Sequence, residues 1–210
     1  MNIAGIRTDY KKMTLDEDVV EKNAIDQFGI WWEHAVQSKI EEVNAMTLAT
    51  SSSNGKPDAR IVLLKDFSEK GFVFFTNYNS AKGIELSENP VACLVFFWKE
   101  LERQIRISGS VEKVPDADSD AYFYSRPVGS RIGAWSSPQS QPIPSRDIIE
   151  SNEKYFLEKY GEEVPRPEHW GGYIVKPEAI EFWQGRPNRL HDRLLYTLEN
   201  EEWKIERLAP

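Results

Sequence analysis

The chain has 210 residues, a formal net charge of -8 and a sequence pI of about 5.1. This length is enough for one domain with a substantial core, and the acidic balance argues against nucleic-acid or membrane-surface binding. A single cysteine, Cys93, excludes an internal disulfide, and with three scattered histidines no metal site is expected. The N-terminal residues lack the apolar run of a signal peptide and no segment reaches transmembrane length, so we expect a cytoplasmic protein.

The N-terminal part of the chain predicts an arm followed by helices. The arm has little apolar content, and its candidate ligand contacts are Arg7 and Tyr10. Asp26 and Gln27 mark the expected start of the second helix. Apolar side chains then recur at helical spacing, namely Phe28, Trp31, Trp32, Ala35 and Val36.

The pattern then changes to that of strands, which we expect over residues 45–51, 59–66 and 71–77. Asn54-Gly55 is a strong signal for a hairpin turn between the first two. In the second strand an apolar block, residues 61–64, lies between Arg60 and Lys65. We expect this strand to be buried through its middle, with a cation near each end.

A short helix is expected after the third strand, capped by Ser80 and ended by Pro90. Its free backbone N–H groups form a candidate anion site, with Lys82 in the first turn. A lysine there opposes the helix dipole, which favours an anion between them. A lysine that simply points to water is an equally good interpretation.

The second half predicts further antiparallel strands with peripheral helices. Ser108-Gly109-Ser110 indicates a bulge in a long hairpin. Asp116 or Asp118 is expected to cap one helix and Ser145 another, with a long loop of Gly, Pro and Ser between these helices. The remaining strands are expected over 171–185, broken at Lys176-Pro177, and in a terminal hairpin turned at 199–201. Together these elements predict a mainly β, barrel-like domain with α additions.

The segment 181–193, EFWQGRPNRLHDR, concentrates cations and a large ring in an acidic protein. Arg189, His191 and Arg193 are spaced by two, so in an extended chain they leave one face together. With Trp183 beside them, they suit a ligand that is both aromatic and phosphorylated. The alternative is a strand with an exposed charged face and a tryptophan in the core.

Cations elsewhere also call for anionic partners if they are buried. Two phosphate groups, one on a cofactor and one on a substrate, would satisfy the set Arg60, Lys65, Lys82, Arg126, Arg189 and Arg193. The sequence contains no nucleophile elbow and no glycine-rich phosphate loop. A bound cofactor is therefore expected to carry the reaction, with the protein supplying binding and orientation.

Several motifs resemble those of the pyridoxine/pyridoxamine 5'-phosphate oxidase family. They occur in family order over nearly the whole chain: RIVLLK (60–65), FFTN (74–77), LERQ (101–104), YFYSRP (122–127), IGAWSSPQS (132–140), WGGY (170–173), EFWQG (181–185) and RLHDR (189–193). The resemblance implies an FMN-binding split β-barrel and a homodimer with FMN at the subunit interface. Residues 1–40 would be an arm and helices packed on the barrel, and residues 41–210 the barrel itself, ending in a dimerisation segment.

The resemblance also implies the reaction: oxidation of pyridoxamine 5'-phosphate and pyridoxine 5'-phosphate to pyridoxal 5'-phosphate, in vitamin B6 biosynthesis and salvage. O2 would be the acceptor, giving H2O2, with ammonia released from the amine. The implied FMN contacts are Arg60, Ile61, Val62, Leu63, Leu64, Lys65, Phe75, Thr76, Lys82, Gln104, Gln139, Ser140, Trp183 and Arg193. The implied substrate contacts are Arg7, Tyr10, Lys65, Tyr122, Arg126, Ser130, Arg189 and His191, of which Arg189 and His191 would be catalytic.

This chain departs from the family pattern at two positions. Ala81 stands where the family commonly has arginine, so one guanidinium contact to the FMN phosphate is expected to be missing. Phe75 stands where tyrosine is frequent, which keeps the ring and removes a hydroxyl. Two other functions stay open: another flavin oxidase or reductase on the same barrel, and a carrier that binds FMN or pyridoxal phosphate without turnover.

Overall fold

The computed structural model describes residues 3–5 and 9–210, so the predicted contact Arg7 lies outside the described residues. The strands are β1 (Ala45–Ser51), β2 (Pro57–Leu63), β3 (Asp66–Ser68), β4 (Gly71–Asn77), β5 (Val91–Trp98), β6 (Arg103–Lys113), β7 (Trp170–Gln184), β8 (Asp192–Glu199) and β9 (Glu202–Arg207). The helices are α1 (Ala24–Gln37), α2 (Ala81–Glu88), α3 (Asp116–Ser125), α4 (Val128–Ser136) and α5 (Asp147–Tyr160), with short 3-10 turns η1 (Ile3–Gly5), η2 (Lys99–Leu101) and η3 (Pro187–Arg189). None of the described helices is long and apolar enough to cross a membrane.

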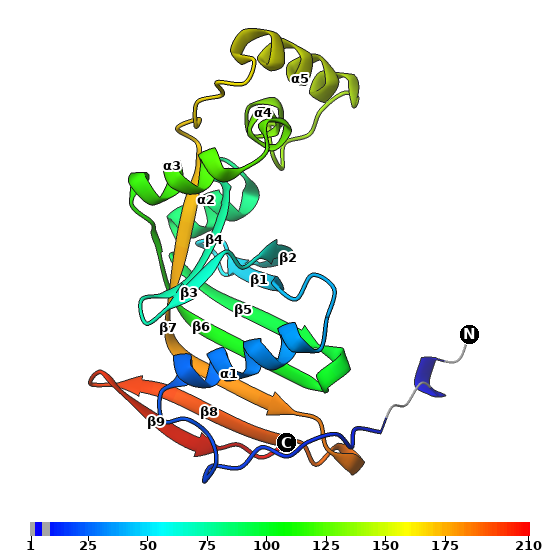
Figure 1. Cartoon of the computed structure of the whole chain (residues 1–210), viewed down its shortest axis with the longest axis vertical. Coiled ribbons are helices and arrows are strands. Elements are labelled where there is room, and N and C mark those ends of the chain that lie inside the picture. The colour runs from blue at the N-terminus through cyan, green and yellow to red at the C-terminus, as the bar shows by residue number, and fades with distance from the viewer. Residues whose placement is uncertain (1–2, 6–8) are drawn as a thin grey trace.

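All nine described strands join one antiparallel sheet that divides along β7 (Figure 1). The main path runs β2-β1-β5-β6-β7-β4-β3, and β8 and β9 branch from β7. The first part of β7, from Trp170 to Val175, pairs with β4, whereas the part from Ala179 to Gln184 pairs with β8. Strand β7 therefore runs the length of the molecule and links its two ends.

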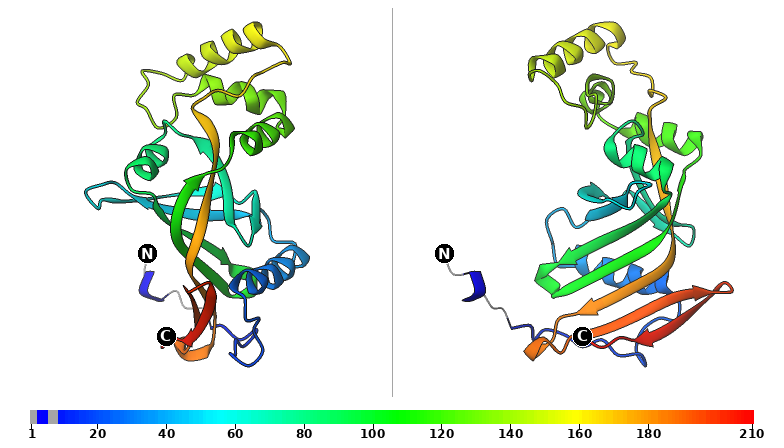
Figure 2. Two further views of the ribbon diagram at one scale, coloured as in Figure 1. Left: turned by 90° about the vertical axis from the view of Figure 1, so that its left-hand side faces the viewer. Right: turned by 180° about the vertical axis from the view of Figure 1, so that it is seen from behind.

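Two hydrophobic clusters correspond to these ends. In the larger one, α1 packs Phe28 against Phe72 and Phe96, and Trp31 against Phe182, with ring centroids 4.9–5.5 Å apart. The smaller cluster lies under α3, α4 and α5, which stand together at the end of the molecule away from β8 and β9 (Figure 2). The predicted class, mainly β with peripheral helices, is confirmed.

Several local predictions are wrong for identifiable reasons. Helix α1 begins earlier than expected, because the Asn23 side chain accepts a hydrogen bond from the Ile25 N–H at 2.7 Å. Helix α3 has no side-chain cap, since Pro115 occupies that position and the aspartates lie in the first turn. Helix α5 also lacks one, because the hydroxyl of Ser145 contacts Asp147 instead.

Larger corrections concern the predicted loop and the predicted strand break. Residues 128–136 form helix α4, which packs Trp135 on Phe156 and Tyr160 of α5, so tertiary contacts outweigh the glycine-rich local sequence. The predicted break at Lys176-Pro177 is absent, and β7 continues through Pro177. A bulge next to the proline leaves Glu178 unpaired. At such an irregularity the strand tolerates a residue that has no backbone N–H to donate.

Strand β2 is not buried through its middle, as the sequence predicted. It lies at the edge of the sheet, where Ile61 is 65% exposed and Leu63 is 38% exposed. Val62 packs against the core while only partly buried, and Leu64, just after the strand, is fully part of the core. In a single chain the apolar block therefore presents a surface to a ligand or to another chain.

Replacing Gly109 with alanine should lower the free energy of unfolding by about 3 kcal/mol, because a well-packed site gains atoms it cannot hold. A Cβ at this position would lie 1.8 Å from the carbonyl oxygen of Lys176 on β7. Urea denaturation at constant m-value measures the change. The matched control is Gly129→Ala in α4, where a Cβ meets nothing within 4 Å and the stability should be unchanged or slightly higher.

Candidate functional site

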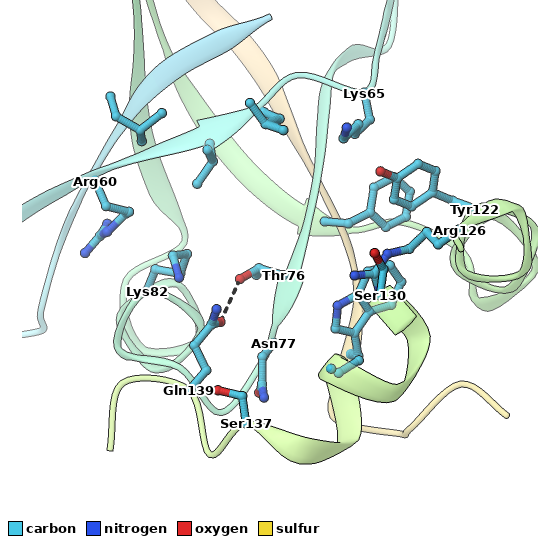
Figure 3. Close-up of a pocket in the computed structure, with 17 residues that line it drawn as sticks. Arg60, Lys65, Thr76, Asn77, Lys82, Tyr122, Arg126, Ser130, Ser137 and Gln139 are labelled. Atoms are coloured by element: carbon cyan, nitrogen blue, oxygen red, sulfur yellow. Dashed lines mark hydrogen bonds between the residues drawn. The ribbon is translucent and has the colours of Figure 1, made fainter. Parts of the chain in front are cut away.

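A cavity of about 610 Å³ opens between the edge strand β2, strand β4 and helices α2, α3 and α4 (Figure 3). Most of the predicted ligand contacts of the first two-thirds of the chain line it. They are Arg60, Ile61, Val62, Leu63, Lys65, Phe75, Thr76, Lys82, Tyr122, Arg126, Ser130 and Gln139. The structure therefore brings together side chains that lie far apart in the sequence.

The α2 side of the cavity presents a buried lysine. Ser80 caps α2 by accepting from the Gly83 N–H, as predicted, and this places Lys82 in the first turn. Lys82 is 8% exposed, and within the described part of the chain its Nζ contacts the Ser80 hydroxyl at 3.4 Å but no carboxylate. Burial, and then the nearby Arg60, lower the pKa of Lys82. An anion in the cavity would relieve both effects.

Arg60 has carboxylate partners of its own, unlike Lys82. Its guanidinium contacts Glu85 at 3.0 Å and also Asp58. The expectation that Arg60 needs a ligand phosphate for charge balance is therefore wrong. Its place in the cavity wall still leaves it available to a ligand that displaces part of this network.

The opposite side of the cavity is aromatic and cationic. Phe75 stacks on Tyr122 with ring centroids 4.0 Å apart, and Trp170 continues the stack 5.5 Å from Phe75. The Arg126 guanidinium lies 4.7 Å from the Trp170 ring, and the Lys65 ammonium lies 5.7 Å from that of Tyr122. Arg126 follows α3 with extended backbone, so it does not share a helical face with Tyr122 although the two residues are four apart in sequence.

Arg126 is the second cation of the cavity that, within the described part of the chain, lacks a partner for part of its side chain. Its Nη1 is buried without a hydrogen-bond partner in the described residues, and burial lowers the pKa of the side chain. Buried guanidinium groups are normally paired with a carboxylate, a phosphate or a carbonyl. An anionic group between Arg126 and its neighbours Lys65 and Ser130 would supply that partner.

A second group of predicted contacts lies on another face of the sheet. Gln104 on β6, Trp183 on β7 and Arg193 on β8 stand side by side in one cross-strand row, which Phe97 on β5 extends. Their side chains point away from the core, and none of them lines the cavity. Arg193 is held by Glu181 at 2.8 Å, and that hydrogen bond raises its pKa.

His191 lies next to this row, and neighbouring groups determine which of its ring nitrogens carries the proton. Its ring lies 4.6 Å from Trp183, and Nδ1 accepts a hydrogen bond from the Arg186 N–H at 3.0 Å. Burial and the adjacent Arg189 lower its pKa, so the ring is neutral at pH 7 with its proton on Nε2. Tyr10 packs edge-on against both Trp183 and His191.

The expectation that Arg189, His191 and Arg193 share one extended face is wrong. Arg189 closes the turn η3 with a left-handed φ of 62°, and His191 precedes β8. Two other predicted contacts also fall outside the cavity: Leu64 is part of the core, and Ser140 is an exposed residue with a φ of 68°. Additional lining residues, found within the motifs noted above but not predicted individually, are Asn77, Gly133, Ala134, Ser137 and Trp170.

The fold and the cavity define a class of protein: a split, antiparallel β-barrel whose cation-lined cavity suits an anionic, ring-containing ligand. The family model for pyridoxamine 5'-phosphate oxidase matches residues 32–160, and the model for the pyridoxine 5'-phosphate oxidase C-terminal dimerisation region matches residues 170–210. The chain belongs to the pyridoxamine 5'-phosphate oxidase family and is an oxidoreductase. The predicted family is thus confirmed.

Individual relatives agree with this assignment. The pyridoxine/pyridoxamine 5'-phosphate oxidase of Trichormus variabilis is 59% identical over 210 residues, covering 99% of this chain and 98% of that protein. Pyridoxine/pyridoxamine 5'-phosphate oxidase 1 of Ralstonia nicotianae is 55% identical over 100% of this chain and 99% of its own length.

Solved structures confirm the split-barrel fold. PhzG from Burkholderia lata, in complex with tetrahydrophenazine-1-carboxylic acid, is similar with a TM-score of 0.90 and 28% identity, covering 97% of this chain and 100% of PhzG. A pyridoxamine 5'-phosphate oxidase-related, FMN-binding protein from Nostoc punctiforme is similar with a TM-score of 0.73 and 17% identity, covering 91% of this chain and 100% of that protein. The second likeness concerns the fold alone.

Proposed function

We propose that the chain oxidises pyridoxamine 5'-phosphate and pyridoxine 5'-phosphate to pyridoxal 5'-phosphate, with FMN as cofactor and O2 as electron acceptor. The reduced product of O2 is H2O2, and the amine substrate also consumes water and releases ammonia. The observation that carries the proposal is one cavity with two cations, the buried Lys82 and the half-buried Arg126, for which no carboxylate partner exists among the described residues. Two phosphorylated ligands would satisfy both, and full-length relatives carry the name of this activity.

The residues present fit FMN. Lys82 in the first turn of α2 and Arg60 on β2 would hold its phosphate, since helix N-termini and cations favour phosphate groups. The backbone and side chains of residues 61–63, with Phe75, Thr76 and Gln139, would line the rest of the cofactor. When bound, FMN supplies the ring system that accepts two electrons from the substrate and passes them on to O2.

The substrate would use the other side of the cavity. Lys65, Tyr122, Arg126 and Ser130 are the proposed ligands of its phosphate, and they converge from α3, α4 and the end of β2. Arg189 and His191 would orient the pyridine ring and the reacting carbon. Because Nδ1 of His191 is already occupied, its Nε2–H can donate a hydrogen bond but cannot accept a proton. We therefore assign His191 to orientation of the substrate rather than to proton abstraction.

The complete site would be shared between two copies of the chain. Trp170 lines the cavity at one end of β7, and Trp183 lies near the other end of the same strand (Figure 1). At about 3.3 Å per residue, the strand between the two positions is roughly 40 Å long. One chain cannot place both on one ligand, so a second copy would supply Gln104, Trp183, Arg193, Arg189 and His191. The match to the family's dimerisation region supports this homodimer.

The function is tested by the colour of the protein. Purified protein reconstituted with FMN should be yellow, and anaerobic pyridoxine 5'-phosphate should bleach it, because the substrate reduces the flavin. Under air, pyridoxal 5'-phosphate and H2O2 should accumulate in equal amounts. A yellow protein that neither phosphorylated substrate bleaches would refute the oxidase activity and favour a carrier. Bleaching by the unphosphorylated alcohol at equal concentration would contradict the phosphate clamp.

Subunit mixing tests whether the site is shared. Arg126→Ala damages the cavity half of the site, and Arg189→Ala damages the half assigned to the second copy. Each variant alone should be nearly inactive. Co-expressed in equal amounts, they should recover about a quarter of wild-type activity, because half of the dimers are mixed and each mixed dimer has one intact site. No recovery would place both arginines in a site formed by a single chain.

Restoring an arginine at position 81 should strengthen FMN binding by about tenfold, since a hydrogen bond to a charged group contributes roughly 1.5 kcal/mol or more. Ala81 is the exposed first residue of α2, next to Lys82, so the longer side chain fits without repacking. FMN titration by fluorescence quenching measures the change. Ser87→Arg, which adds the same charge to an exposed position further along α2, should leave the Kd unchanged.

A further inference from the structure

The N-terminal arm is fixed to the body of the protein by one buried carboxylate. Glu102 follows the turn η2 and is 8% exposed. Its Oε2 accepts hydrogen bonds from the backbone N–H groups of Lys11 and Lys12, at 2.9 and 3.0 Å. These groups lie about ninety residues away in sequence, so the contact decides where the arm runs.

Glu102 is itself held in an unusual conformation. Its φ of 55° is left-handed, which is costly for a residue with a side chain. Its carbonyl oxygen accepts the Gly185 N–H at 2.7 Å, so the same residue binds the arm through its side chain and the end of β7 through its backbone. The direction of the carboxylate toward the arm is therefore set by the backbone of Glu102 and its burial, and is not one rotamer among many of an exposed side chain.

The anchor places Tyr10 directly against Trp183, which is assigned to the cofactor, and His191, which is assigned to the substrate. The Tyr10 ring lies 5.7 Å from that of Trp183 and 5.9 Å from that of His191. It rests on Gly185, where a Cβ would lie 2.7 Å from the Tyr10 Cγ. Gly185 does not have a positive φ, so its lack of a side chain serves the close approach of Tyr10 and not the backbone conformation.

A second contact fixes the arm further along. The Leu15 N–H donates to Asp192 at 3.1 Å, and the Leu15 side chain is buried. Asp192 follows His191 directly and also pairs with Arg186 and Arg207. The stretch between the two anchors is thus tied at both ends, with Tyr10 just before the first anchor.

We propose that Glu102 is a positioning residue for substrate binding: its carboxylate holds the arm so that Tyr10 closes over Trp183 and His191. This inference rests on the function proposed above, in which His191 contacts the substrate, and on the substrate contact that the family resemblance implies for Tyr10. Glu102 touches neither substrate nor cofactor and acts through Tyr10. Loss of the anchor should therefore weaken substrate binding and leave the oxidation step and the FMN content unchanged.

The test combines proteolysis with kinetics on the FMN-loaded enzyme. Asparagine tolerates the left-handed conformation but is one methylene too short to reach the arm, so Glu102→Asn removes the anchor without new strain. Trypsin cleavage after Lys11 and Lys12, followed by mass spectrometry, should be at least about tenfold faster in this variant. The KM for pyridoxine 5'-phosphate should rise about tenfold, with kcat within about twofold of wild type.

Three further variants separate positioning from general damage. Glu102→Gln keeps the length and one acceptor oxygen and should recover most of the trypsin resistance and the low KM. Gly185→Ala leaves the anchor intact but displaces Tyr10, so it should raise KM with little change in cleavage. In the Tyr10→Ala background, Glu102→Asn should add no further rise in KM, because the two residues act as one unit.

The outcomes distinguish this inference from the proposed function. Unchanged trypsin cleavage in Glu102→Asn overturns the anchor, whatever the enzyme does. Faster cleavage with an unchanged KM overturns the role in substrate binding. Absence of turnover in the wild-type chain overturns the proposed function, and the cleavage rates still decide whether Glu102 holds the arm.

Discussion

Replacing Arg189 with alanine should lower kcat by about 100-fold while the protein keeps its FMN, because the loss of one orienting contact displaces the reacting atoms. Arg189 is exposed in the single chain and does not line the cavity, so its removal should not disturb the cavity residues assigned to FMN. Asn188 and Arg189 both have left-handed φ values, 56° and 62°, and such strained positions cluster where side chains are held for function. Steady-state oxidation of pyridoxine 5'-phosphate and the visible absorbance of the flavin are measured on the same sample.

The control for this prediction is Arg146→Ala, which removes an exposed arginine just before α5, where it pairs with Glu150 of that helix. It should leave kcat, KM and FMN content unchanged, and both variants should unfold within about 0.5 kcal/mol of wild type. If Arg189→Ala loses FMN, the residue belongs to the cofactor and not to the substrate. Turnover at the wild-type rate would remove Arg189 from the site altogether.

Replacing Lys82 with methionine should have opposite effects on cofactor binding and on the stability of the apoprotein. FMN binding should weaken by roughly 10- to 100-fold, since a buried charged contact to the phosphate is lost. The apoprotein should become more stable, by about 1 kcal/mol, because a buried cation without a carboxylate partner is replaced by an apolar chain of similar length. The lowered pKa of Lys82 reflects the same unfavourable burial of charge. FMN titration and urea denaturation of the apoprotein measure the two effects.

Lys70→Met is the matched control, since Lys70 is exposed in the turn between β3 and β4. It should change neither quantity. A less stable apoprotein in Lys82→Met would mean that the lysine stabilises the empty cavity wall, and an unchanged FMN affinity would place the phosphate elsewhere.

Elements with strong local signals were predicted almost to the residue. The strands predicted over residues 45–51 and 71–77 are β1 and β4, and the turn at residues 199–201 joins β8 and β9 as expected. The failures have a common cause in tertiary structure. Helix α4 is stabilised by α5 despite its glycines and serines, and β7 continues through Pro177 because a bulge accommodates it. The exposure of Ile61 followed from the place of β2 at the edge of the sheet, which the apolar pattern could not reveal.

The candidate site was predicted unevenly for a related reason. The resemblance to the family selected residues that gather in the cavity, such as Lys82 and Arg126. It did not say which of the selected residues would lie together within one chain and which would not. The same resemblance selected Gln104, Trp183 and Arg193, which lie in a row across β6, β7 and β8 on another face of the sheet. The anchoring of the arm by Glu102 was not predicted, although the residue lies in the motif LERQ, because a glutamate in a turn looks like any exposed acidic residue.

The apolar outer side of β5, with Val91 and Phe97 at 48% and 53% exposure, has a consequence for how the cofactor is retained. Apolar surface of this kind, together with exposed Ile61 on β2, favours association of two chains. If FMN contacts both chains, it binds the dimer and not the single chain. FMN binding and dimer formation are then linked, so each one shifts the equilibrium of the other. Dilution should then release FMN even at a fixed excess of the cofactor, and saturating FMN should hold dimers together at concentrations where the apoprotein dissociates.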